Sequence, residues 1–415
     1  MMGGRLFERN PGVISSKYAC MVLAFCALFG LLLGRIWWFG EASTWAGFIR
    51  ACLFLCLLLS IVNRDFIRQL LHKNYLFWFV GIFLFYIAMS SALLGDGKTL
   101  RRVFLVLALF IAVAQIASRW QGIWNTLIST AGAFSALASV VTLWALWQAG
   151  LLNLGDRAAA ISGSGIAGIA EFENSVLASL QMGFSLVLIA WLFLTAKARL
   201  AQIVWLLCLL VTSVYLFGTF GRTGWLAAAI AIVVLITVIG SRRQQYVFWG
   251  GGLVFVVLVV MFFQERIAYE LLSRKLTHRD EIWGMVLGLM QGKWLLGYGA
   301  DASVEELLGV QRLGLHEAVI NHAHSIYIEV IFNYGLVGLC GLIILLVGSI
   351  WRLWMHRDNP VSALWLAILV GAAISIGFDF SSFLSTPNLV WLWVWLPVAF
   401  ACALPARPIT SSREV

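Results

Sequence analysis

The chain has 415 residues, of which 62% are hydrophobic and only 11% are charged, an apolar excess far above that of an ordinary soluble domain. This composition excludes a soluble fold, and only 6 prolines with no long polar tract exclude collagen-like and disordered chains. The net charge of +9 comes mostly from short breaks between apolar runs, which orient a chain in a bilayer, so we expect contact with membrane lipids and not with nucleic acid.

Apolar runs long enough to cross a bilayer recur along the chain, since about 20 residues of helix span about 30 Å of hydrocarbon. Twelve are predicted, near residues 13–34, 44–62, 75–95, 99–118, 122–150, 173–195, 199–218, 223–240, 245–263, 325–347, 361–378 and 386–404. The sequence therefore predicts an all-α polytopic membrane protein. We divide it into nine transmembrane helices (1–263), a helical outer segment (264–324), and three further transmembrane helices with a tail (325–415).

The positions of Lys and Arg set the expected orientation. With the N-terminus in the cytoplasm, most of these residues lie inside and both termini are cytoplasmic. The exceptions, Lys98, Arg101, Arg102 and Arg222, lie in short breaks on the outer side. Lysine and arginine are usually enriched on the cytoplasmic side, so positive residues on the outer side predict an anionic ligand at the outer face.

A shorter outer loop, residues 151–172, carries Arg157 and a glycine-rich stretch at 163–168 with the GxGxxG spacing of a dinucleotide loop. No β-strand precedes it and no βαβ unit follows, which favours a flexible loop with close backbone packing over cofactor binding. The seven cysteines all fall in apolar runs, so neither a disulfide framework nor a zinc site is expected.

Arg222 lies in Gly-Arg-Thr-Gly-Trp at the outer start of the eighth span. One interpretation is an arginine that snorkels to lipid headgroups. The other is a phosphate clamp, in which the flanking glycines allow close approach and the helix N-terminus adds positive potential to the planar guanidinium.

The outer segment contains an amphipathic helix beginning near Thr277, because Thr277 and Asp280 have capping-box spacing and apolar residues follow at helical intervals. Arg279 falls in its first turn, where a cation opposes the helix dipole unless an anion completes the site. A local salt bridge with Asp280 or Glu281 is the alternative.

The most unusual polar cluster is Asn-His-Ala-His-Ser at 321–325, immediately before an apolar helix. Two histidines at i, i+2 do not share a helical face and lack a carboxylate or thiol at metal spacing, so zinc is not expected. Either His322 and His324 cap the interface, or one is a general base poised near neutral pH.

Asp379 is the only charged residue between positions 361 and 404 and lies near the outer ends of the last two predicted spans. An unpaired carboxylate there is costly, so a partner is expected, with His324 or an arginine as candidates.

Three motifs in this order resemble the O-antigen ligase and polymerase superfamily of membrane glycosyltransferases. They are Gly-Arg-Thr-Gly-Trp at 221–225, Arg-Asp-Glu-Ile-Trp at 279–283 followed by Gly-Tyr-Gly at 297–299, and His-Ala-His-Ser-Ile-Tyr-Ile at 322–328 leading to Tyr-Gly-Leu-Val-Gly-Leu at 334–339. The resemblance covers residues 218–345 and includes an acidic residue at Asp379.

The resemblance implies transfer of O-antigen from undecaprenyl diphosphate to a hydroxyl of lipid A–core, at the periplasmic face of a Gram-negative inner membrane. It assigns the general base to His324 and the donor diphosphate to Arg222 and Arg279. Asp379, His322, Arg101, Arg102 and Arg157 are expected to support them, and no metal or cofactor is expected. A polymerase that uses the same donor is the alternative, and a lipid or polysaccharide transporter is the rival outside the family.

Overall fold

The computed structural model describes residues 11–62, 66–67, 70, 72, 74–93, 97–117, 121–152, 160–269, 278–300, 302–313, 316–380 and 382–405. Its elements, in chain order, are α1 (Pro11–Leu33), α2 (Ala42–Val62), α4 (Tyr75–Leu93), α5 (Gly97–Ala117), α6 (Gln121–Gln148), α7 (Ser175–Thr195), α8 (Arg199–Gly218), α9 (Arg222–Ile239), α10 (Arg242–Ala268), α11 (Arg279–Gly288), α12 (Val304–Leu308), β1 (Val310–Leu313), β2 (His316–Val319), α13 (Ile326–Met355), α14 (Pro360–Ser375), the π-helix η3 (Trp391–Trp395) and α15 (Leu396–Ala403).

These elements confirm an all-α polytopic membrane protein. Among the described residues, nine helices are long and apolar enough to cross a membrane, and shorter apolar helices lie at Lys17–Leu33, Pro360–Ser375 and Trp391–Ala403. Each of the twelve predicted spans coincides with one of these helices. Local sequence explains several boundaries: Asn174 caps α7 by accepting from the Leu177 amide, and Asn359 caps α14 before a proline at its first position.

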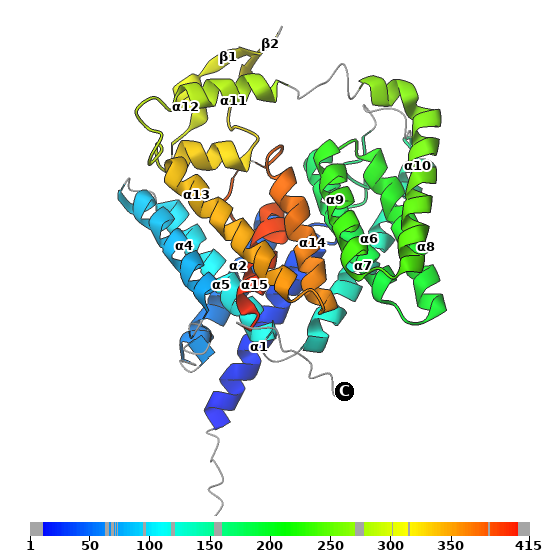
Figure 1. The fold of residues 1–415 in the computed structure, drawn as a ribbon, viewed down its shortest axis with the longest axis horizontal. Helices are drawn as coiled ribbons and strands as arrows, with labels where there is room; N and C mark the ends of the chain where they lie inside the picture. Colours follow the sequence, from blue (N-terminus) through cyan, green and yellow to red (C-terminus); the bar gives the residue numbers. More distant parts are fainter. Residues whose placement is uncertain are drawn as a thin grey trace, which may run out of the picture.

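Helix α9 packs against both α7 and α14 in the middle of the bundle (Figure 1). Small residues make these contacts close. A Cβ added at Gly183 of α7 would lie 2.8 Å from the carbonyl oxygen of Gly224, and one at Gly371 of α14 would lie 2.6 Å from that of Ala227. The N-terminus of α9 and the C-terminus of α14 are thus held at the same end of the bundle.

Helix α13 is broken at Gly335, whose φ of 64° and ψ of −164° are not helical. The segment 293–299 packs into this break. The Leu336 amide donates to the Trp294 carbonyl at 2.8 Å, and the Tyr298 amide donates to the Phe332 carbonyl at 2.8 Å. A Cβ at Gly335 would lie 2.2 Å from the Leu295 carbonyl oxygen, so only glycine fits there. The Gly-Tyr-Gly and Tyr-Gly motifs therefore have a packing role.

The described part of the outer segment covers one end of the bundle, where α11, α12 and the two strands lie above α13 (Figure 1). It has a small core of its own, which Ile282 and Val286 of α11, Val304 of α12 and Phe332 of α13 share. The amphipathic helix is confirmed. The antiparallel hairpin of β1 and β2, which pairs Val310 with Val319, was not predicted, because two four-residue strands give no detectable periodicity.

Candidate functional site

Asp379 is the centre of a polar cluster at this end of the bundle. It follows α14, and its carboxylate accepts hydrogen bonds from Arg279 of α11 and from the Thr223 hydroxyl of α9. The Arg279 and Asp379 side chains are only 16% and 11% exposed. The expectation that Asp379 pairs with an arginine is confirmed, and the ion pair joins residues 100 positions apart.

Arg279 is the first residue of α11, and the N-cap is His278 in a left-handed conformation with no side-chain capping bond. The expected cap, Thr277, lies outside the described residues. Nδ1 of His278 and a carboxylate oxygen of Glu281 lie 2.9 Å apart, within hydrogen-bond distance, while Arg279 contacts Asp379. The local salt bridge considered for Arg279 is therefore wrong, and the tertiary carboxylate is its partner.

The two histidines lie beside this ion pair, with ring centroids 4.0 Å apart. Their loop is held from both sides. The Trp283 indole of α11 donates to the Ala323 carbonyl at 2.9 Å, and the Ala323 amide donates to Glu329 of α13 at 3.3 Å. His324 itself adopts the left-handed region with φ of 51°, which is uncommon for a residue other than glycine. A loop fixed at its central residue keeps both rings together.

Burial lowers the pKa of both imidazoles. Burial lowers the pKa of His322, against an opposing effect of the Asp379 carboxylate. The pKa of His324 falls to about 4, first through burial and then through the positive charges of His322 and Arg279, while Asp379 opposes the shift. His324 is therefore neutral at pH 7 and can accept a proton, but it is not poised near neutral pH as expected.

Arg222 begins α9 one residue before Thr223, so the same helix start carries both. The flanking glycines have another role than the one expected. A Cβ at Gly221 would lie 2.1 Å from the Ser179 hydroxyl of α7, and one at Gly224 would lie 2.4 Å from the Ser179 backbone. The glycines allow α9 to approach α7, which corrects the expectation that they make room for a phosphate.

The remaining candidate residues are Arg101, Arg102 and Arg157. Arg102 donates to the carbonyl of Leu384 at 3.3 Å and so contacts the loop that follows Asp379, whereas Arg101 is exposed on α5. Arg157 lies outside the described residues. Sequence reasoning missed Thr223, although its place beside Arg222 at a helix start was a usable signal.

The glycine-rich loop packs against the protein itself. The Ser164 hydroxyl donates to the Ile169 carbonyl at 2.6 Å, and the Ala170 amide donates to the Ile36 carbonyl at 2.7 Å. Gly168 has φ of 78°, and a Cβ there would lie 2.3 Å from the Phe39 ring. The glycine spacing thus allows close packing, as expected from the interpretation that was favoured over cofactor binding. Across the described residues, no group of three His, Cys, Asp or Glu side chains could hold a metal ion.

Comparison with known proteins agrees with the motifs in the site. Residues 207–343 match the family described as O-antigen ligase, a region that contains Arg222, Arg279 and His324. An O-antigen ligase of Pseudomonas aeruginosa strain PAO1 is 25% identical over 137 residues, which is 32% of this chain and 32% of that relative. The match thus spans about a third of each protein. Over this region, the chain is similar to the O-antigen ligase family.

Proposed function

We propose that this protein transfers a glycan from undecaprenyl diphosphate to a hydroxyl of lipid A–core, with inversion at the anomeric carbon and no metal. The observation that carries the proposal is the neutral His324 beside the buried ion pair of Arg279 and Asp379. The name of the Pseudomonas aeruginosa relative favours ligation over polymerisation. The cluster lies in the proposed periplasmic half, formed by the outer segment 264–324 and the outer ends of the flanking transmembrane regions.

In this proposal, His324 takes the proton of the acceptor hydroxyl as the oxygen attacks the anomeric carbon. The resulting imidazolium is stabilised by Asp379, whose charge already raises the pKa of His324 against the other effects. As the glycosidic bond breaks, negative charge grows on the leaving diphosphate, and the guanidinium groups of Arg222 and Arg279 neutralise it. Arg279 then divides its hydrogen bonds between the diphosphate and Asp379, because one guanidinium has five donors.

The test is reconstitution in vesicles with purified lipid-linked glycan and lipid A–core, in the presence of EDTA. We expect glycan transfer by the unmodified protein, about a hundred- to ten-thousand-fold slower transfer by His324→Ala with donor binding intact, and a milder effect of His322→Ala. Arg222→Ala and Arg279→Ala should weaken donor binding as well as turnover, and lysine should rescue poorly because it lacks the bidentate fork.

Other outcomes contradict the proposal in separable ways. A longer lipid-linked glycan with no product on lipid A–core indicates a polymerase, and movement of the lipid across the bilayer without transfer indicates a transporter. Normal transfer by His324→Ala together with no transfer by His322→Ala would show that the proposal names the wrong histidine as the base. Turnover lost in EDTA and restored by magnesium overturns the metal-independent mechanism.

A further inference from the structure

Glu329 is a half-buried carboxylate that has no role in the proposed mechanism. It lies in the first turn of α13, the helix that follows the histidine loop. Its Oε2 accepts from the Ala323 amide at 3.3 Å, and its Oε1 lies 3.5 Å from Nδ2 of Asn333, one turn further along the helix. Glu329 therefore reaches back from α13 to the residue between the two histidines.

Ala323 depends on this bond because it is fully buried and lies outside any helix or strand. Both of its backbone polar groups are satisfied by side chains. The Trp283 indole donates to its carbonyl at 2.9 Å, and Glu329 accepts from its amide. A buried amide without an acceptor costs about as much free energy as a lost hydrogen bond. Loss of the Glu329 acceptor would therefore favour a shift of the loop toward water or another acceptor.

The residues after Ala323 increase the dependence of the loop on Glu329. His324 has φ of 51°, a conformation that persists only where the surrounding contacts hold it. Ser325 is the N-cap of α13, but its side chain makes no capping hydrogen bond. The side chain of Glu329 thus connects the loop to the start of the helix, as the side chain of Ser325 does not.

The helical turn that carries Glu329 is itself fixed. The carbonyl of Asn333 accepts from the Gly299 amide at 2.8 Å, next to the break of α13 at Gly335. The Gly-Tyr-Gly segment therefore holds the part of α13 from which Glu329 reaches the loop. The charges that shift the pKa of His324 are those of His322, Arg279 and Asp379, so Glu329 acts through the Ala323 backbone and not on the imidazole charge.

We propose that Glu329 is a positioning residue for the transfer reaction, because its bond to the Ala323 amide holds both imidazoles beside the buried ion pair. The expected effect on rate rests on the proposed function, whereas the effect on the loop does not. The role needs a hydrogen-bond acceptor but no negative charge. Glutamine can therefore replace Glu329, whereas alanine cannot. Methionine keeps the length of the side chain without a strong acceptor, which separates the lost bond from a packing defect.

The first test measures the loop without use of activity. The full chain in phosphatidylcholine nanodiscs is treated with diethyl pyrocarbonate, and the modification of each histidine is quantified by mass spectrometry. We expect the labelling of His322 and His324 to rise several-fold in Glu329→Ala and Glu329→Met and to stay unchanged in Glu329→Gln. Tyr327→Phe is the matched control, because it removes a hydrogen bond from the same turn to the Ala373 carbonyl, and it should leave the labelling unchanged.

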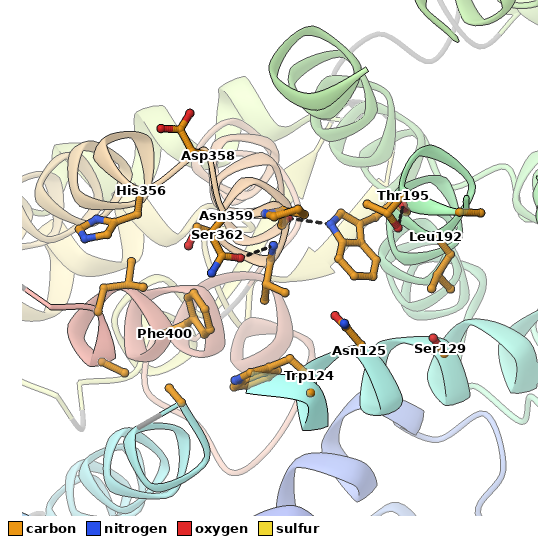
Figure 2. Close-up of a pocket in the computed structure, with 18 of the residues that line it drawn as sticks. Trp124, Asn125, Ser129, Leu192, Thr195, His356, Asp358, Asn359, Ser362 and Phe400 are labelled. Atoms are coloured by element: carbon orange, nitrogen blue, oxygen red, sulfur yellow. Dashed lines mark hydrogen bonds between the residues drawn. The ribbon is translucent and has the colours of Figure 1, made fainter. Parts of the chain in front are cut away.

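His356 is the internal marker of an intact fold in this experiment. It is the C-cap of α13, at the other end of the helix from Glu329, where it is one of the residues that line a cavity (Figure 2). Its Nε2 is buried, and its Nδ1 is 2.9 Å from the Arg352 carbonyl. Labelling of His356 should therefore stay low in every variant.

The second test is the reconstituted transfer reaction. Glu329→Ala and Glu329→Met should lower kcat by up to about a hundredfold, since a misplacement of about 1 Å has an effect of this size. The KM for the lipid-linked donor should stay unchanged, because Arg222 and Arg279 are untouched. Glu329→Gln should keep most of the activity and the pH profile of the unmodified protein.

Unchanged histidine labelling and unchanged kcat in Glu329→Ala and Glu329→Met overturn the positioning role. If His324→Ala abolishes transfer at the same time, only this inference fails and the proposed function stands. Loss of transfer in Glu329→Gln with unchanged labelling also overturns it, because the reaction then needs the charge or a proton of Glu329. Raised labelling in Glu329→Ala and Glu329→Met, with no transfer by the unmodified protein, supports the hold of Glu329 on the loop and rejects the transferase.

Discussion

Asp379→Ala is the substitution that most directly tests the buried ion pair. Opposite charges about 3 Å apart attract by about 5 kcal/mol at an effective dielectric constant of about 20. The two side chains are only 16% and 11% exposed, so loss of the carboxylate leaves the Arg279 charge buried without a counter-charge. We expect the free energy of unfolding to fall by about 3–5 kcal/mol. Thr223 loses its acceptor as well, which adds to the loss.

Unfolding of the purified protein by SDS in mixed micelles measures this change. The matched control is Glu173→Gln, which breaks the more exposed ion pair with Arg35 and should cost at most about 1 kcal/mol. The double variant Arg279→Ala, Asp379→Ala should recover part of the stability, because no unpaired charge remains. If Asp379→Ala is as stable as the control variant, the pair is not a buried ion pair in the membrane protein, and the proposed role of Asp379 fails.

Three further predictions concern pH, helix packing and topology. The pKa of His324 is lowered to about 4, so the folded state holds this side chain neutral. This stabilises the fold above about pH 6.5, and the stabilisation is lost as the pH falls toward 4. Transfer should persist to about pH 5.5, and half-loss of transfer near pH 6.5 would mean that the pKa of the base is unshifted. Gly224→Ala should lower the melting temperature, since its Cβ would lie 2.4 Å from the Ser179 backbone; an unchanged value would contradict the close packing of α7 and α9. In Glu305→Cys and Arg242→Cys, both at exposed positions, an impermeant thiol reagent added outside should label only position 305 above the native background, and the reverse pattern would invert the topology.

Hydrophobicity along the chain was enough to predict the transmembrane architecture. A polar backbone group without a partner is so costly in lipid that a long apolar run has essentially one stable conformation there, the helix. The same local logic found the amphipathic helix α11, whose Ile282 and Val286 face a small core. It also singled out Arg279, His324 and Asp379 as polar groups with no evident local reason to be where they are.

The sequence around each of these groups could not predict its partners. Asp280 and Glu281 lie beside Arg279 in sequence, yet the return of the chain through α14 brings Asp379 to it, and the packing of α9 brings Thr223. Likewise, the glycines at 221 and 224 fit either a ligand or a neighbouring helix until Ser179 is found against them. The fall of the His324 pKa also depends on burial and on charges from distant segments. Sequence determines the helices because their hydrogen bonds are local, whereas the site depends on contacts such as that of Thr223 with Asp379, 156 positions apart, which only the tertiary structure decides.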